Sequence, residues 1–211
     1  MNTDKNFLIK RSFLDGINRE LIISDTFLKF QNKDLKKNPF TIFEKEEIAE
    51  YKYGIRWISF RITYGRDYQI FVRNKKGEIL KINFKSYFGK NKKEYHQKYI
   101  DILNVLWNNF FDEIAQDFLK KFKNNESFKI GNVEFDEVGI TIAISGIAKT
   151  KKTKISWENV RTKNYYTYFA IYSSQNPSEI NRGYNYHDDW NTGVLYSVLR
   201  TILKSKNIET Y

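Results

Sequence analysis

The sequence contains no cysteine, and histidine occurs only twice, as His96 and His187. The absence of cysteine excludes disulfide scaffolds, thiolate zinc sites, iron–sulfur clusters and cysteine nucleophiles. Two histidines leave little material for imidazole-based acid–base catalysis. The composition therefore favours binding over chemistry, although it does not indicate what is bound.

Long hydrophobic runs are also absent. Residues 1–11 never reach the apolar run of about 7–15 residues that a secretory signal needs. No stretch approaches the roughly 18 consecutive apolar residues of a membrane-spanning helix. The sequence therefore predicts a cytoplasmic protein without a transmembrane segment.

Motifs that bind nucleotides or metals are missing as well. Residues 146–150 read Gly-Ile-Ala-Lys-Thr, but a phosphate-binding loop needs a second glycine directly before the lysine. His187, Asp188 and Asp189 form the one tight group of candidate metal ligands, and adjacent residues at a strand–helix junction rarely point at one centre. We therefore expect no enzyme activity, no metal and no cofactor.

Aromatic and basic residues are abundant instead. The chain has 17 Phe, 15 Tyr and 4 Trp among 211 residues, which is ample for a packed core, so disorder is not expected. Lys and Arg total 36 against 25 Asp and Glu, a net charge of +11. Such an excess attracts nucleic acid, acidic membrane surfaces or acidic protein partners. Acidic and basic residues are interspersed, as they are on an ordinary solvated surface.

The first half of the chain predicts a meander of short antiparallel strands. Two β-rich runs, residues 68–73 and 78–84, flank the polar loop 74–77, whose length and final glycine are typical of a hairpin. From position 80 onward the second run alternates between apolar and polar residues. The earlier β-like runs, separated by turn formers, are 21–24, 27–30, 40–43 and 56–63.

From residue 92 the spacing of apolar residues changes from that of a strand to that of a helix. Residues 92–124 contain no Gly or Pro, and their apolar residues recur at three- and four-residue steps, the stripe of an amphipathic helix. A continuous helix would be roughly 45 Å long, whereas a break near Asn108 and Asn109 would give two helices. Either arrangement makes this segment the expected joint between two domains. The stripe comprises Tyr95, Tyr99, Ile102, Leu106, Phe110, Ile114, Phe118 and Phe122.

A second β-rich series follows this helix. Asp188 and Asp189 then supply an N-cap and a negatively charged first turn. A final helix is expected from about Trp190 to Lys204, with an apolar stripe at Leu195, Val198, Leu199 and Ile202. The β-like runs of this half are 128–130, 133–135, 140–144, 153–157, 160–163 and 166–173.

The two halves resemble each other. Phe43–Ile48 aligns with Ile155–Val160 at one offset, so that Glu46 matches Glu158. The order of strands, an acidic-aliphatic corner, further strands and a capping helix occurs twice.

This order resembles the pleckstrin-homology-like (PH-like) superfold, an antiparallel β-sandwich or barrel closed by a C-terminal helix. The most specific element is Lys154–Val160, which is similar to the Trp-containing corner of bacterial PH-like domains; the first copy has Lys45 in place of that Trp. The Asn/Lys-rich composition and Asp189–Asn191 also resemble an uncharacterised protein family of Bacteroidetes. The resemblance implies an α+β protein of two tandem PH-like domains. Their bounds are 1–111 with a capping helix, 112–126 as a helical joint, and 127–211 with a C-terminal helix.

Trp157 is expected to be structural. Two-residue spacing puts Ile155 and Trp157 on the same face of a strand, and Val160 follows at the corner. We therefore predict that Trp157 lies in the core of the second domain and not in a binding site.

An aromatic strand provides the first candidate site. Its residues alternate by face. The face suited to the core holds Phe169 and Ile171, and the other holds Tyr166, Tyr168 and Tyr172. Tyrosine, a large ring with a polar tip, is enriched at binding surfaces. The alternative is that this face packs on the long helix or the first copy. Residues that border it in the sequence are Arg161, Lys163, Arg182, Tyr184 and Tyr186.

A lysine cluster provides the second candidate site. It consists of Lys149, Lys151, Lys152 and Lys154. The PH-like resemblance implies that a basic loop at this place binds anionic lipid headgroups, although the split basic pattern of the eukaryotic lipid-binding members is not matched. Each lysine near an anionic surface contributes about 1 kcal/mol, so the attraction would be weak and salt-sensitive. A solvated loop is the alternative.

These observations lead to one expected function and three alternatives. We expect a non-enzymatic adaptor that recognises a protein or peptide partner through the second PH-like domain. The alternatives are binding of anionic lipid headgroups at the lysine cluster, binding of nucleic acid through basic loops interleaved with aromatics, and an immunity-type protein that blocks a toxin.

Overall fold

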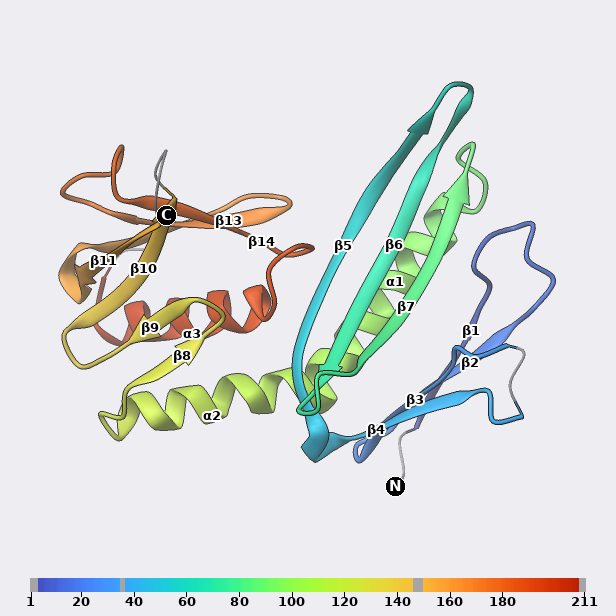
Figure 1. Cartoon of the computed structure of the whole chain (residues 1–211), viewed down its shortest axis with the longest axis horizontal. Coiled ribbons are helices and arrows are strands. Elements are labelled where there is room, and N and C mark those ends of the chain that lie inside the picture. The colour runs from blue at the N-terminus through green and yellow to red at the C-terminus, as the bar shows by residue number, and fades with distance from the viewer. Residues whose placement is uncertain (1–3, 35–36, 146–149, 209–211) are drawn as a thin grey trace. The chain divides into compact units, whose positions relative to one another are not determined.

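The chain forms two compact units of mixed α and β structure (Figure 1). The computed structural model describes residues 4–34, 37–145 and 150–208. The first unit spans Met1–Glu113 and the second Ile114–Tyr211. Neighbouring strands pair antiparallel, and the predicted α+β class is confirmed. Over the described residues the strands form four separate sheets and no closed barrel.

The first unit contains a four-stranded and a three-stranded sheet, each with its strands in sequence order. The four-stranded sheet consists of β1 (Lys5–Ile9), β2 (Arg19–Ile23), β3 (Phe27–Gln31) and β4 (Phe40–Glu44). The three-stranded sheet consists of β5 (Ile48–Phe60), β6 (Thr63–Asn74) and β7 (Ile79–Tyr87). The alternation predicted for β7 is confirmed, because Leu80, Ile82 and Phe84 are buried.

Two strands of this unit differ from the sequence-based prediction. The run 56–63, expected as one strand, contains the end of β5, a turn at Arg61 and Ile62, and the start of β6. The prediction is wrong because this turn lacks the Gly or Asn that marks most two-residue hairpins. β1 has no predicted counterpart, since only Ile9 of its five residues is buried.

A buried arginine ties together the loops of the four-stranded sheet. The Arg19 side chain is 3% exposed and pairs with Asp15 and Asp34. Its Nε and Nη2 donate to the two carboxylate oxygens of Asp34, each at 2.8 Å. Asp15 also accepts hydrogen bonds from the backbone N–H groups of Arg11 and Ile17. Burial by itself raises the pKa of Asp15, but the hydrogen bonds outweigh it and lower the pKa to about 2.

One uninterrupted helix joins the two units in the sequence. It consists of α1 (Lys92–Leu106), the π turn η2 (Trp107–Phe111) and α2 (Asp112–Lys123). The break considered near Asn108 and Asn109 is therefore wrong, and a π turn accommodates one extra residue there. Among the described residues, no helix is both long enough and apolar enough to cross a membrane. The buried residues of α1 and η2 are Tyr95, Tyr99, Ile102, Leu106, Phe110 and Phe111.

His96 of α1 lies beside the aromatic core of the first unit. It is half-buried, and its ring centroid lies 6.1 Å from that of Tyr68. Its Nδ1 is buried and has no hydrogen-bond partner among the described residues. The residue therefore belongs to the periphery of the aromatic core.

The second unit repeats the division into a four-stranded and a three-stranded sheet. The four-stranded sheet consists of β8 (Phe128–Ile130), β9 (Val133–Phe135), β10 (Gly139–Ser145) and β11 (Thr150–Ser156). The three-stranded sheet consists of β12 (Val160–Asn164), β13 (Tyr168–Ser173) and β14 (Asn181–Asn185). β14 escapes prediction because three of its five residues, Asn181, Gly183 and Asn185, are poor strand formers.

The last helix, α3 (Thr192–Ser205), begins after Asn191, which has a φ of 57°. The predicted cap at Asp189 is wrong. Its Oδ2 accepts the backbone N–H of Asn185 at 2.8 Å, and the Thr192 hydroxyl donates to the Asp189 carbonyl at 3.1 Å. Asp189 therefore fixes the turn between β14 and α3. The predicted stripe of Leu195, Val198, Leu199 and Ile202 is buried.

Trp157 lies in the core of the second unit, as predicted. Trp157 is only 6% exposed and begins the 3-10 turn η3 (Trp157–Asn159). The indole Nε1 donates to the Asp136 carbonyl at 3.1 Å. The ring centroids of Phe122 and Phe135 lie 5.4 Å and 6.2 Å away.

The two units share one order of elements: a four-stranded sheet, a 3-10 corner, a three-stranded sheet and a helix. The corners are η1 (Lys45–Glu47) and η3. The residues that precede them have nearly the same backbone angles, φ −67° and ψ 150° at Glu44 and φ −65° and ψ 150° at Ser156. A left-handed asparagine precedes each helix, Asn91 in one unit and Asn191 in the other.

Candidate binding surface

The outer face of the β12–β14 sheet gathers several of the predicted site residues. Residues directly opposite one another in antiparallel strands share a face. We call this outer face the tyrosine face. The residues that the strand register places on it are Arg161 and Lys163 of β12, Tyr168, Ala170 and Tyr172 of β13, and Asn181, Gly183 and Asn185 of β14. The inner face carries Phe169 and Ile171, which are fully buried, as predicted.

Tyr168 is the best-fixed aromatic residue of the tyrosine face. Its ring stacks on that of Tyr165 at a centroid distance of 4.5 Å and an interplanar angle of 15°. It also lies over Gly183, where an added Cβ would come within 3.2 Å of the ring. Neither Tyr165 nor Gly183 is singled out by the sequence, because the turn between β12 and β13 places Tyr165 and the pairing of β13 with β14 places Gly183. Tyr172 is half-buried further along the strand.

Tyr166 lies outside the strand. It is in the turn between β12 and β13, which the hydrogen bond from the Tyr165 N–H to the Tyr168 carbonyl closes at 2.9 Å. Its exposed fraction is 84%. The prediction that it shares the strand face of Tyr168 is therefore wrong, and it stands instead at the tip of the hairpin that bounds that face.

The tyrosine face carries positive charge. Arg161 donates from Nη1 to the backbone carbonyls of Glu158 at 2.8 Å and Val160 at 2.9 Å, so these bonds orient the guanidinium without neutralising it. The Lys163 ammonium lies 5.5 Å from the Tyr165 ring centroid, in a cation–π contact. None of the residues that the register places on this face is acidic.

Arg182 and Tyr184 lie on the inner face and do not border the tyrosine face. Tyr184 is buried, and burial raises the pKa of its phenol. Arg182 reaches toward the four-stranded sheet, where its Nη1 donates to the Ala143 carbonyl at 2.5 Å. Tyr186 donates its hydroxyl to the Asn164 side-chain oxygen at 3.1 Å. All three residues therefore serve the internal structure of the second unit.

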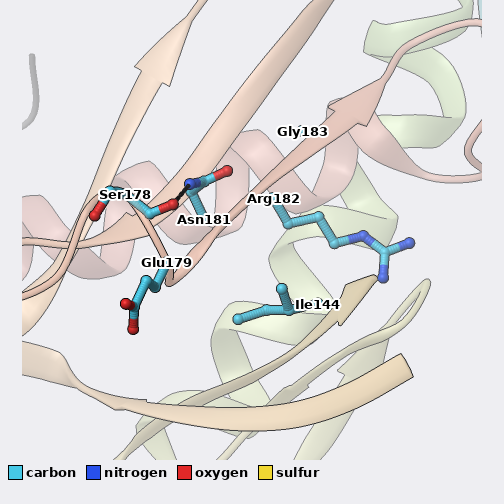
Figure 2. Close-up of a pocket in the computed structure, with 6 residues that line it drawn as sticks. All are labelled: Ile144, Ser178, Glu179, Asn181, Arg182 and Gly183. Carbon is cyan, nitrogen blue, oxygen red and sulfur yellow. Dashed lines mark hydrogen bonds between the residues drawn. The ribbon is translucent and has the colours of Figure 1, made fainter. Parts of the chain in front are cut away.

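An open pocket of about 480 Å³ lies beside Arg182 (Figure 2). In Figure 2 the side chains of Arg182 and Glu179 point in opposite directions. The Asn181 amide donates to the Pro177 and Ser178 carbonyls at 2.9 Å and 3.0 Å. The Asn181 amide therefore stabilises its own turn, the Arg182 guanidinium is engaged with β10, and the polar groups do not converge on a ligand position. The lining residues are Ile144, Ser178, Glu179, Asn181, Arg182 and Gly183.

The described lysines of the lysine cluster lie on β11, in the other sheet of the unit. Lys152 pairs with Glu134 at 2.7 Å, and this hydrogen bond lowers the pKa of the Glu134 carboxyl. Lys154 pairs with Asp136 at 2.8 Å. Lys151 is exposed on the opposite face of the strand from these two, and Lys149 lies outside the described residues. The two candidate sites thus belong to different sheets, and carboxylates offset part of the lysine charge.

The candidate metal ligands form no shared centre. His187 Nδ1 contacts the neighbouring Asp188 carboxylate at 2.8 Å. Asp189 is engaged with the backbone of Asn185. Within the described ranges, no group of three or more His, Asp or Glu side chains has the arrangement of a metal site.

Comparison with protein-family models gives no match, and comparison with curated proteins gives no relative.

Proposed function

We propose that this chain is a non-enzymatic binding protein built of two tandem PH-like units, and that the tyrosine face of its second unit recognises an acidic segment of a protein or peptide partner. The repeated order of four strands, a corner, three strands and a helix supports the PH-like assignment. So does the corner Lys154–Val160, whose Trp157 is a core residue.

The observation that carries the proposal is the exposure of tyrosine rings on and beside a sheet whose other face buries Phe169, Ile171 and Tyr184. Tyr166 is 84% exposed and Tyr168 is 36% exposed. Tyrosine gives a large contact area with little loss of conformational freedom, and its hydroxyl bonds at the rim of an interface. Because Tyr168 is already held by Tyr165 and Gly183, little ordering is needed when a partner binds.

Charge indicates the chemistry of the partner. Arg161 and Lys163 flank the rings, and no acidic residue shares the face by register. A partner with Asp or Glu side chains would be steered toward this surface and would pair with the Arg161 guanidinium, which is already oriented by backbone carbonyls. An acidic protein segment therefore fits better than a neutral or basic one.

The experiment is capture of a partner from the native host by the immobilised chain, followed by affinity measurement with the purified partner. We expect the combined change of Tyr166, Tyr168 and Tyr172 to Ala to weaken binding at least about tenfold, since a central aromatic contact contributes about 2 kcal/mol or more. Tyr64→Ala is the matched control, because Tyr64 is exposed in the first unit. Full retention of the partner by the triple variant would refute the proposal.

A further inference from the structure

The β5–β6 hairpin of the first unit ends in exposed apolar side chains. Trp57, Phe60, Ile62 and Tyr64 are between 58% and 88% exposed. Further along β6, Tyr68, Ile70 and Val72 are fully buried. Figure 1 shows the hairpin extending past the end of β7. We call residues 56–66 the hairpin tip.

Most of the hairpin tip extends beyond the third strand of its sheet, β7, with which only Gly65 and Arg66 of the tip are paired. β7 ends at Tyr87, opposite Gly65. At Gly65 the strands approach so closely that an added Cβ would lie 2.2 Å from the Ser86 carbonyl oxygen. Beyond this point only the two strands continue, up to the Phe60–Thr63 pair. The exposed side chains of the hairpin tip therefore do not serve the core of the sheet.

The turn of the hairpin tip is built from residues that turns disfavour. Arg61 adopts a left-handed φ of 49°, and Ile62 follows it. Two-residue hairpin turns favour Asn and Gly, which adopt this conformation at little cost. An unfavourable residue at such a position points to a role for its side chain outside the fold.

Basic side chains lie among the apolar residues of the hairpin tip. Residues 51–66 contain no Asp or Glu, and the hairpin tip carries Arg56, Arg61 and Arg66. The Arg66 guanidinium carbon lies 4.6 Å from the Trp57 ring centroid, and that of Arg61 lies 5.5 Å from the Phe60 ring centroid.

The connection between β7 and α1, which adjoins the hairpin tip, also carries aromatic and basic residues. Phe88 donates its N–H to the Tyr64 carbonyl at 2.9 Å, and the two rings meet edge-on at 5.5 Å. Lys90, Lys92 and Lys93 follow within five residues. Aromatic and basic side chains are therefore concentrated at this end of the first unit.

Apolar residues occupy both faces of the two-stranded ribbon. By register, Trp57, Tyr64 and Arg66 share one face, Phe60 lies on the other, and Ile62 is in the connecting turn. A folded partner or a nucleic-acid strand that stacks on rings would cover one face. A lipid layer surrounds an inserted ribbon on all sides, so it matches this distribution best.

We propose that the hairpin tip attaches the first unit to an anionic lipid bilayer, with Ile62 and Phe60 entering the acyl boundary, Arg56 and Arg66 remaining among the lipid phosphates, and the long Arg61 side chain reaching back toward them. The Trp57–Arg66 pair lies three residues from the Phe60–Thr63 pair, which is about 10 Å along the strand. Interfacial segments bury their apolar groups by about 5–10 Å, with Trp and Arg at headgroup level. This site differs from the lysine cluster and from the tyrosine face.

Vesicle co-sedimentation of the full chain tests the proposal. The probes are vesicles of phosphatidylcholine alone and vesicles of equal parts phosphatidylcholine and phosphatidylglycerol. We expect binding to the acidic vesicles at low salt, weaker binding at moderate salt, and little binding to the neutral vesicles. Absence of binding to acidic vesicles at low salt would overturn the proposal.

Two variants of exposed residues separate the apolar and charged contributions. Phe60→Ser with Ile62→Ser should reduce the vesicle partition coefficient at least about tenfold. Arg61→Gln with Arg66→Gln should reduce it roughly 25-fold, because each basic residue contributes about fivefold near an anionic surface. The charge-matched control is Lys123→Gln with Lys204→Gln, two exposed lysines of the second unit that should change binding far less. Circular dichroism verifies that each variant is folded.

Quenching by lipids with brominated acyl chains locates the inserted residue. Acidic vesicles that contain brominated phosphatidylcholine should quench the emission of the wild-type chain, and Trp57→Phe should remove that quenching while vesicle binding persists. Equal binding by wild type and both tip variants would overturn the proposal. So would tip-dependent retention on a single-stranded oligonucleotide in a chain that does not bind vesicles. The tyrosine face is intact in all these variants, so the outcome is independent of the protein-binding proposal.

Discussion

Replacement of Trp157 by Ala tests whether the corner between the two sheets of the second unit is part of its core. The indole lies between Phe122 and Phe135, and the Lys206 ammonium lies 5.5 Å above its ring. Truncation removes these contacts and leaves the Asp136 carbonyl without its indole donor. Truncation of a buried Phe or Trp costs about 3–5 kcal/mol. Since domains are stable by about 5–15 kcal/mol, we expect the second unit to lose a large part of its stability.

The assay is urea unfolding followed by amide hydrogen exchange, which reports protection along the chain. In Trp157→Ala, the amides of β8–β11 should lose protection at lower urea than in the wild type, while those of β5–β7 should change much less. Trp57→Ala is the matched control: this Trp is 73% exposed, so its loss should change stability by no more than about 0.5 kcal/mol. A second unit that unfolds at the same urea concentration in Trp157→Ala and wild type would refute the core assignment.

Two further predictions concern the first unit. Gly65→Ala places a Cβ 2.2 Å from the Ser86 carbonyl oxygen, so β7 must shift and we expect a loss of roughly 1–3 kcal/mol in urea unfolding. Gly16→Ala, with open space around the new Cβ, is the control, and equal midpoints for the two variants would contradict the argument. The pKa of Asp15 is lowered from 3.8 to about 2 in the folded chain, so its carboxylate stabilises the fold above pH 3.8 and this contribution is lost as the pH falls toward 2. Asp15→Asn should therefore flatten the dependence of unfolding free energy on pH in this window, and an unchanged slope would count against the Arg19 pairing.

The parts of the fold that periodicity controls could be predicted from the sequence. Alternation placed Phe169 and Ile171 in the core, and three- and four-residue steps predicted both the long helix and the buried stripe of α3. Two-residue spacing identified Trp157 as a core residue. In each case the side-chain pattern follows directly from the geometry of the strand or helix.

The parts that depend on tertiary pairing could not be predicted. β14 contains three poor strand formers, Asn181, Gly183 and Asn185, and exists because β13 pairs with it, which is also why Arg182 and Tyr184 face inward. The turn at Arg61 lacks the usual turn residues, so the run 56–63 reads as one strand. Asp is a residue type that commonly caps the N-terminus of a helix, but the Asp189 carboxylate accepts the Asn185 N–H instead.

The candidate site was predicted in part. Strand alternation selects Tyr168 and Tyr172, and the register of β12 adds Arg161 and Lys163 to the same face. The hairpin tip was not predicted at all. Its signal in the sequence is the acid-free run 51–66, in which Trp57 and the arginines occur together.

The π turn η2 changes the direction in which the later side chains of the long helix point around its axis. From Ile102 to Phe122 the apolar stripe advances in steps of four residues, and each step exceeds one turn of an α-helix by about 40°. An unbroken α-helix would therefore carry Phe118 and Phe122 well away from the face that begins the stripe. Five such steps accumulate about 200°, and one extra residue in η2 sets the helix back by about 100°, which removes about half of this drift. At the level of the gene, a substitution within 107–111 is a local change, whereas the loss of a single codon there would rotate α2 by about 100° relative to α1, while the contact of Phe122 with Trp157, both in the second unit, would be kept.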